Sequence, residues 1–196
     1  KMIAEPIRML DTVMRVNGGS AFIVTSAEEA RKICPRPVYL LGFGECDNYY
    51  HDTKQLGDVT STGVGQASRD AMTMAGVARG DINFLQPYDD YTIAVLMQIE
   101  DIGFCEKGKG GKFVEETDIS YKGELPINTG GGQISAGQPG LAGGQVNLIE
   151  GIRQLRGEGG EPQIDDARLG MITGIGALQY GRNVGFNSVG ILGTEV

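Results

Sequence analysis

Two kinds of apolar pattern alternate along this chain, and the alternation restricts its fold more than any other feature. Apolar or β-prone runs of strand length occupy residues 38–43, 82–85, 169–173 and 184–192. Between them, apolar side chains recur at helical spacing over residues 64–75, 91–102 and 141–155. Strands that alternate with helices in this way predict an α/β fold.

Residues at the ends of these patterns predict where several helices begin and end. Ser26 is a good N-cap for a short helix that follows it. Gly76 and Gly103 follow the helical patterns over 64–75 and 91–102, and glycine is common directly after a helix. We therefore expect these two helices to stop at their glycines.

Three other segments are predicted from spacing and composition. Residues 2–10 are compatible with a short helix, residues 21–25 (AFIVT) with a strand, and residues 104–124 with a long loop. The pattern over 91–102 is apolar almost all round, so we expect that helix, capped by Asp90, to lie at the centre of the fold.

The sequence around Pro139 combines a glycine-rich loop with the start of a helix. The chain has 32 glycines, about twice the usual share of ~7%. Seven of them flank Pro139, namely Gly130, Gly131, Gly132, Gly137, Gly140, Gly143 and Gly144. We expect backbone to approach another group closely here. The helix that Pro139 begins has the predicted apolar face Leu141, Leu148, Ile149, Ile152 and Leu155.

The charge of the chain argues against a nucleic-acid-binding surface. The formal net charge is −8, whereas such a surface needs clustered basic residues. Lys107, Lys109 and Lys112 lie in a glycine-rich stretch followed by acidic residues, so we expect a solvated loop and no phosphate clamp.

Cysteine content and hydropathy indicate an ordinary intracellular chain. Cys34, Cys46 and Cys105 lack metal-ligand spacing, so we expect no zinc site or disulfide framework. No apolar run approaches the ~18 residues of a membrane span, and no signal peptide opens the chain. We expect a cytoplasmic location. Because Lys1 occupies the place of an initiator methionine, we also expect a fragment of a longer protein.

Five motifs occur in the order and spacing of one protein family. VNGGSAFIVTSAEEARKI resembles its SDGAAAVVLASEERA segment, and RPVYLLGFGE resembles the strand that opens its C-terminal half. AGVARGDINFLQPYDDYT resembles AGLxxxDIDxxExxEAF, INTGGGQISAGQPGLAGGQ resembles VNxxGGxxxxGHPxGAxG, and MITGIGALQYG occupies the place of CxGGGxG. The chain thus resembles the C-terminal half of the thiolase superfamily. The PYDDYT box and the insertion before ELPINTGGG look most like its non-specific lipid-transfer, or sterol-carrier-type, branch.

The resemblance implies a thiolase-like fold, a mixed β-sheet with helices on both faces. Residues 1–36 would end the N-terminal half, and residues 37–196 would form the C-terminal domain. It further implies a homodimer that binds an acyl-CoA thioester substrate between the halves, without a covalently bound cofactor. The reactive cysteine of the family lies in the N-terminal half, in a region that this chain does not contain.

Three positions that serve catalysis in family thiolases have different residues here. Tyr88 replaces the Asn or His that holds an oxyanion-stabilising water, and Gln138 replaces the GHP histidine that activates the nucleophile. Gly174 aligns with the closing cysteine, which shuttles a proton. Glutamine does not exchange protons at neutral pH and glycine has no proton to give. We therefore do not expect Claisen condensation or thiolysis by the usual route.

The substitutions resemble those in thiolase-fold aldolases that cleave side chains from steroid acyl-CoAs. A retro-aldol step needs a base for the β-hydroxyl and donors for the thioester enolate. Tyr88 could be the base, with Gln138 and the backbone N–H groups of residues 131–137 as donors. The predicted substrate-binding residues are Gly131, Gly132, Gly137, Gly174 and Gly176. The aldolases have tyrosine at the GHP position, and this chain departs from them at Gln138.

Two alternative functions follow from the same resemblance. One is an acetyl-CoA acyltransferase that uses a cysteine of the missing half. The other is a non-catalytic lipid-transfer or scaffold subunit, supporting an OB-fold, zinc-ribbon partner as related proteins do. Among the remaining polar residues, Asp89 and Asp90 are predicted to start a helix, Tyr180 to pack, and His51 to lie in a surface loop.

Overall fold

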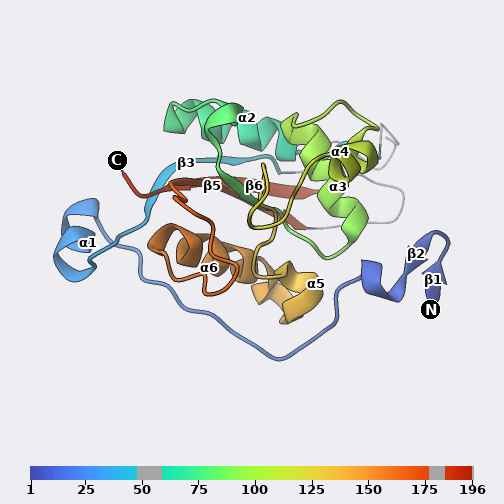
Figure 1. Cartoon of the computed structure of the whole chain (residues 1–196), viewed down its shortest axis with the longest axis horizontal. Helices are drawn as coiled ribbons and strands as arrows, with labels where there is room; N and C mark the ends of the chain where they lie inside the picture. The colour runs from blue at the N-terminus through green and yellow to red at the C-terminus, as the bar shows by residue number, and fades with distance from the viewer. Residues whose placement is uncertain (48–58, 177–183, 196) are drawn as a thin grey trace.

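A four-stranded mixed sheet organises the chain (Figure 1), whose computed structural model describes residues 1–47, 59–176 and 184–195. The strands lie in the order β3 (Tyr39–Glu45), β6 (Phe186–Gly193), β5 (Leu169–Gly176) and β4 (Phe84–Gln86). β6 is antiparallel to both of its neighbours, whereas β4 and β5 are parallel. The predicted α/β fold and the strands near residues 38–43, 82–85, 169–173 and 184–192 are therefore confirmed.

Helices cover both faces of this sheet (Figure 1). α2 (Val64–Ala75) packs on β3 and β6, and it contacts α3 (Thr92–Ile102) beside it. α6 (Gly143–Arg156) packs on β5 and β4 from the opposite face, next to the short α5 (Gly132–Ala136).

The contact between α2 and β3 depends on glycine in the strand. A Cβ atom on Gly44 would lie 2.1 Å from the carbonyl oxygen of Ala67, and one on Gly42 would lie 2.2 Å from that of Ala71. Only strand positions without a side chain allow the helix backbone to come this close.

Two apolar clusters fill the space between these layers. The larger lies between the sheet and the α2 layer and includes Val64, Ala67, Leu85, Met171 and Ile191. The smaller lies beneath α6 and consists of Phe84, Leu155, Ile164, Ile172 and Leu192, which are at most 7% exposed. Full burial of such a side chain contributes about 1.5–3 kcal/mol.

Three of the predicted helix ends agree with the structure. Ser26 accepts a hydrogen bond from the Glu29 N–H and caps α1 (Ala27–Ile33). Gly76 and Gly103 adopt left-handed backbone conformations directly after α2 and α3.

Two predictions for the N-terminal region are wrong. Residues 2–10 form β1 (Met2–Ala4), β2 (Ile7–Arg8) and the start of a 3-10 helix (Met9–Asp11). Pro6 lies between the two strands, where its missing N–H disfavours a continuous helix. Residues 21–25 form no strand, because no described strand lies beside them to pair. They belong to an extended segment that passes beneath α5 and α6 (Figure 1).

The helix over 91–102 is less central than predicted. α3 buries Ala94, Gln98, Ile99 and Ile102, whereas Ile93 is 48% exposed. Its N-cap is Tyr91, one residue after the predicted Asp90. The predicted loop 104–124 contains a further short helix, α4 (Gly110–Glu116).

α6 buries a polar stripe that the apolar pattern did not reveal. Asn147, Glu150 and Gln154 are at most 6% exposed, while Leu141, before the helix, is fully exposed. Of the predicted apolar face, Leu148, Ile152 and Leu155 do pack into the smaller cluster. No helix among the described residues is long and apolar enough to cross a membrane.

Candidate active site

Tyr88 lies just beyond the C-terminal end of β4, and buried polar groups fix its backbone. Its N–H donates to Thr173 Oγ1 at 3.0 Å, and its carbonyl oxygen accepts from Gln98 Nε2 at 2.8 Å. Thr173 in turn donates to Gln98 Oε1, so the three residues form a closed set of hydrogen bonds. This set links β4, β5 and α3 at the point where the tyrosine side chain leaves the sheet.

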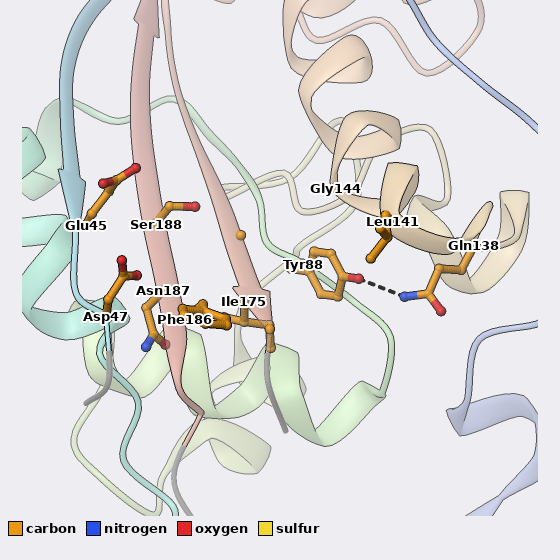
Figure 2. Close-up of a pocket in the computed structure, with 13 residues that line it drawn as sticks. Glu45, Asp47, Tyr88, Gln138, Leu141, Gly144, Ile175, Phe186, Asn187 and Ser188 are labelled. Atoms are coloured by element: carbon orange, nitrogen blue, oxygen red, sulfur yellow. Dashed lines mark hydrogen bonds between the residues drawn. The ribbon is translucent and has the colours of Figure 1, made fainter. Parts of the chain in front are cut away.

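Gln138 meets the Tyr88 side chain directly. Gln138 lies between α5 and α6, and its Nε2 donates to the Tyr88 hydroxyl at 2.7 Å (Figure 2). The two residues are 50 positions apart in sequence. The structure thus brings together the two side chains that were predicted as catalytic.

A cavity of ≈ 700 Å³ opens beside this pair. Figure 2 shows Glu45 and Asp47 across the cavity from Tyr88 and Gln138. Its other lining residues are Gly140, Leu141, Gly144, Gly174, Ile175, Gly176, Phe186, Asn187 and Ser188. None of these lining residues has a basic side chain.

The predicted substrate-binding glycines divide into two groups. Gly174 and Gly176 line the cavity, whereas Gly131, Gly132 and Gly137 are not among its lining residues. Gly174 pairs with Ser188 across the β5–β6 ladder, and a Cβ at Gly174 would lie 2.6 Å from Ser188 Oγ. At the position that aligns with the family cysteine, any side chain would therefore press against the Ser188 hydroxyl at the cavity wall.

The backbone donors predicted in residues 131–137 are largely engaged within the protein. The Gly131 N–H donates to Asn128 O and the Gly137 N–H to Gln133 O. The Gln133 and Ile134 N–H groups donate to the two oxygens of Asp89, at 2.9 and 3.2 Å.

Asp89 has a role that the sequence did not predict. Instead of starting α3, its buried carboxylate caps the first turn of α5, 44 residues away. A Cβ on Gly132 would lie only 2.1 Å from Asp89 Oδ2, so glycine is required there for the carboxylate to fit. Burial raises the pKa of Asp89, and the two backbone N–H groups oppose that rise.

Two asparagines complete the connection between the tyrosine and the glycine-rich loop. Asn147 Nδ2 lies within hydrogen-bonding distance of Pro87 O (2.7 Å), Asn128 Oδ1 (3.0 Å) and Asp89 Oδ1 (3.2 Å). Asn128 also donates to Pro87 O at 3.1 Å. The recurrence of Asn147, Glu150 and Gln154 at helical spacing is the sequence signal for this buried polar face.

The N-terminal segment holds the two site loops from outside. The Val13 N–H donates to Asp90 O at 2.9 Å, and the Gln138 N–H donates to Met14 O at 2.8 Å. The Val16 N–H donates to Gln138 O at 3.3 Å. Residues 12–16, the strap, therefore contact the loop after Tyr88 and the loop of Gln138 at once.

Acidic groups lie near a half-buried phenol in this site. Burial raises the pKa of Tyr88, and the nearby Asp90 and Asp89 charges raise it further. The Gln138 amide lowers this pKa, and the Gln133 amide lowers it to a smaller extent. Burial also raises the pKa of Asp90 to about 6. The Tyr88 hydroxyl can act as a hydrogen-bond donor in its neutral form or as a base once ionised.

The other sequence candidates contribute no described contact to the site. His51 and Tyr180 lie outside the described residues. Lys107 binds Asp101 at 2.7 Å and Glu100 at 3.5 Å, away from the cavity. Within the described ranges, no group of three or more His, Cys, Asp or Glu side chains is arranged to hold a metal ion.

The mixed α/β sheet, the glycine-rich loop and a cavity at the strand ends define a thiolase-type domain. Residues 46–184 match the model of the family described as thiolase C-terminal domain-like, and the chain belongs to this family. The expected thiolase-like fold is thereby confirmed.

Known proteins similar to the chain include thiolases and aldolases. It is 34% identical over 177 residues to an acetyl-CoA acetyltransferase of Methanothermobacter thermautotrophicus, covering 89% of this chain and 46% of the relative. It is 32% identical over 193 residues to the 17-hydroxy-3-oxo-4-pregnene-20-carboxyl-CoA lyase of Mycobacterium tuberculosis, covering 94% and 48%. The chain therefore spans about half the length of these relatives.

A solved structure extends the similarity to three dimensions. The Ltp2-ChsH2(DUF35) aldolase superposes with a TM-score of 0.80 at 25% sequence identity. The superposition covers 99% of this chain and 49% of that one.

Proposed function

We propose that this chain supplies Tyr88 and Gln138 to an enzyme that cleaves a carbon–carbon bond of a β-hydroxyacyl-CoA by a retro-aldol reaction. The observation that carries the proposal is the 2.7 Å hydrogen bond between these side chains at the wall of the cavity. The residue that aligns with the family's proton-shuttling cysteine is Gly174, which disfavours the usual thiolase reaction.

The reaction needs one base and leaves the thioester intact. Ionised Tyr88 takes the proton of the β-hydroxyl, the C–O bond becomes a carbonyl, and the Cα–Cβ bond breaks. Its electron pair moves to the thioester as an enolate, which then takes a proton at Cα. The products are a ketone or aldehyde and a shortened acyl-CoA, and Tyr88 is regenerated if it returns the proton.

Gln138 could serve both the base and the substrate. An amide nitrogen has two hydrogens, and one of them is directed at the Tyr88 hydroxyl. The second can donate to the enolate oxygen, because Gln138 lines the cavity. The glycines at 131, 132 and 137 would then shape the loop, while Gly174 and Gly176 leave room for the acyl group.

The relatives support this reaction without excluding another. A lyase acting on a CoA thioester and a steroid side-chain-cleaving aldolase of Thermomonospora curvata, 30% identical, are both similar to the chain. The acetyl-CoA acetyltransferase, at 34%, is slightly more similar to the chain than either of them. Acyl transfer that uses a cysteine in a longer protein is thus the second candidate, and a non-catalytic role in lipid transfer is the third.

Assembly is proposed from the same comparisons. The solved aldolase has a name that joins Ltp2 with ChsH2(DUF35). We propose that this chain likewise works with a partner protein and as a homodimer, with residues 1–36 belonging to an N-terminal half.

Replacing Tyr88 with phenylalanine tests the reaction. The variant keeps the ring but removes the proposed base, so cleavage of a β-hydroxyacyl-CoA should fall by about 10²-fold or more. Release of the carbonyl product and of acyl-CoA would be followed by chromatography. Tyr121→Phe, in the 104–124 segment, is the matched control and should retain full activity.

Three outcomes separate the candidates. Loss of cleavage in Tyr88→Phe alone supports the retro-aldol reaction. Unchanged turnover in that variant removes Tyr88 from the mechanism. Acyl transfer to free CoA by the wild-type protein, with no cleavage of the β-hydroxy substrate, would favour the acyltransferase.

A further inference from the structure

Gln133 has a buried side-chain amide that makes no hydrogen bond within the described fold. It is 0% exposed, and within the described residues neither Nε2 nor Oε1 of its amide has a hydrogen-bond partner. Gln154, equally hidden at 1% exposed, bonds to Glu150, Pro162 O and the Ile164 N–H. Leaving a buried polar group unpaired destabilises the folded state, so the contrast between the two glutamines suggests that Gln133 has a role other than packing.

The unpaired amide lies beside the Tyr88–Gln138 pair. A Cβ atom on Gly143 would be 2.3 Å from Gln133 Oε1, 2.9 Å from Gln138 Cγ and 3.1 Å from the Tyr88 hydroxyl oxygen. Three side chains therefore converge on one glycine of α6. The glycine leaves the space in which the second amide can turn toward the phenol.

Hydrogen bonds fix the backbone of Gln133, whereas its side-chain amide has no hydrogen-bond partner among the described residues. Its N–H donates to Asp89 Oδ1 at 2.9 Å, and its carbonyl oxygen accepts from the Gly137 N–H at 2.7 Å. The residue thus connects Asp89, directly after the tyrosine, with Gly137, directly before Gln138. A side chain anchored here has a constant position relative to both members of the pair.

We propose that Gln133 is a positioning residue for Tyr88, a second amide that donates to the phenol oxygen when that oxygen carries a negative charge. A neutral phenol oxygen already accepts from Gln138 and has little further demand for a donor. A phenolate is a stronger acceptor with room for a second donor. The proposal rests on the proposed function only in assigning Tyr88 the part of a base.

The charges near Tyr88 make a neutral donor important. Asp89 and Asp90 follow it in sequence, and Glu45 and Asp47 line the same cavity. Arg15 forms a backbone bridge with Gln138, and this basic residue is exposed to solvent. None of the described residues that line the cavity has a basic side chain, and the amides beside the phenol oxygen are those of Gln138 and Gln133.

Gln133→Met tests the inference because it removes the amide and preserves length and flexibility. The protein would be prepared with 3-fluorotyrosine, and the ionisation of Tyr88 followed by ¹⁹F NMR across alkaline pH. The chain has seven tyrosines, and loss of one signal in Tyr88→Phe assigns the resonance. Loss of one charge-assisted donor should raise the pKa of Tyr88 by about one unit.

A packing role predicts different results. If Gln133 only fills space, its replacement leaves the Tyr88 titration unchanged. Under the proposal, the titration moves while the midpoint of urea unfolding stays the same or increases, because two unpaired polar atoms are removed. Gln66→Met, an exposed glutamine of α2, is the control and should change neither measurement.

The result is independent of the reaction itself. An unchanged Tyr88 titration in Gln133→Met overturns the inference, whether or not the protein cleaves a β-hydroxyacyl-CoA. A raised pKa in a protein without cleavage activity would refute the proposed function and leave the inference intact. Should Gln133→Met fail to fold, Gln133→Leu provides the same measurement.

Discussion

Asp90 is an acidic side chain whose charge is disfavoured by its surroundings. It is 9% exposed, and its Oδ1 has no hydrogen-bond partner among the described residues. Burial raises its pKa from 3.8 to about 6, and the Tyr91 N–H opposes the rise. The two oxygens of Asp89 accept hydrogen bonds from backbone N–H groups. The ionised Asp90 carboxylate, by contrast, receives little stabilisation from hydrogen bonds.

Asp90→Asn should therefore stabilise the chain above pH 6. Between pH 3.8 and about 6 the folded state holds a proton that the unfolded state has lost, so the contribution of Asp90 to stability falls as pH rises. Asparagine imitates the neutral form. The gain in free energy of unfolding should be about 1–3 kcal/mol at pH 8 and should shrink toward zero below pH 4.

Urea unfolding at several pH values measures this difference. The exposed α2 residue Asp70 supplies the control, and Asp70→Asn should show no comparable pH-dependent gain. An Asp90→Asn variant less stable than the wild type at pH 8 would contradict the prediction.

Individual site residues differ in how far the sequence could predict them. Tyr88 and Gln138 occupy motif positions, so the family resemblance predicted both as site residues although they are 50 positions apart in sequence. The cap that Asp89 provides for α5 could not be predicted, because it depends on a tertiary approach of two loops. Gln133 was missed for the same reason.

At the level of elements, the strap of residues 12–16 is the part of the fold that couples the two site loops. It bonds to Asp90 O through Val13 and to both backbone groups of Gln138 through Met14 and Val16. A Cβ on Gly137 would lie 2.4 Å from Val16 Cγ1, so the strap also packs tightly on the loop. The positions of the Gln138 loop and of the loop after Tyr88 therefore depend on a segment without regular secondary structure.

Val16→Pro should lower activity more than stability. Proline removes the N–H that donates to Gln138 O, which frees the Gln138 loop to shift away from Tyr88. A misplacement of about 1 Å at a reacting group can cost about 10²-fold in rate, whereas loss of one hydrogen bond costs about 1 kcal/mol.

The measurement pairs kcat with the urea midpoint in the same preparation. Val24→Pro, in the same extended segment but 82% exposed, is the control and should retain normal kcat. Equal losses of kcat in both variants would show that the strap does not position the loop.

Elements with strong local signals were predictable, and those defined by their neighbours were not. α2 and α3 end at glycines in left-handed conformations, a signal present in the sequence itself. α5 has five residues and is capped by a side chain from elsewhere. Residues 21–25 have β-prone side chains yet lack a described strand with which to pair.

Over the whole molecule, one side of the sheet is only partly covered. α2 covers β3 and β6 from one face, while α6 lies mainly over β5 and β4 on the other. Leu40 (60%), Phe43 (51%) and Phe186 (52%) are exposed on the two strands that α6 leaves open. With the fully exposed Leu141 at the cavity, these residues form an open apolar face.

The motif order predicted this architecture because five motifs fix the sequence of strands and helices. The family resemblance also implied that the N-terminal half of a thiolase-type protein would pack against this sheet. The apolar exposure of the open face agrees with that expectation, since large exposed apolar patches usually mark interaction sites.

The chain produced by itself should consequently self-associate through the open apolar face. Light scattering after size-exclusion chromatography should give a mass above 20.8 kDa that rises with concentration. Replacing Leu40 and Phe43 together with glutamate should return the mass to that of a monomer, because charges do not transfer into an apolar contact. Ile93→Glu, an equally exposed position on α3 and on the α2 side of the sheet, should leave association unchanged. A monodisperse monomer of the unmodified chain across the same concentrations would mean that the open face is stable in water, and the implied second half would lose its structural support.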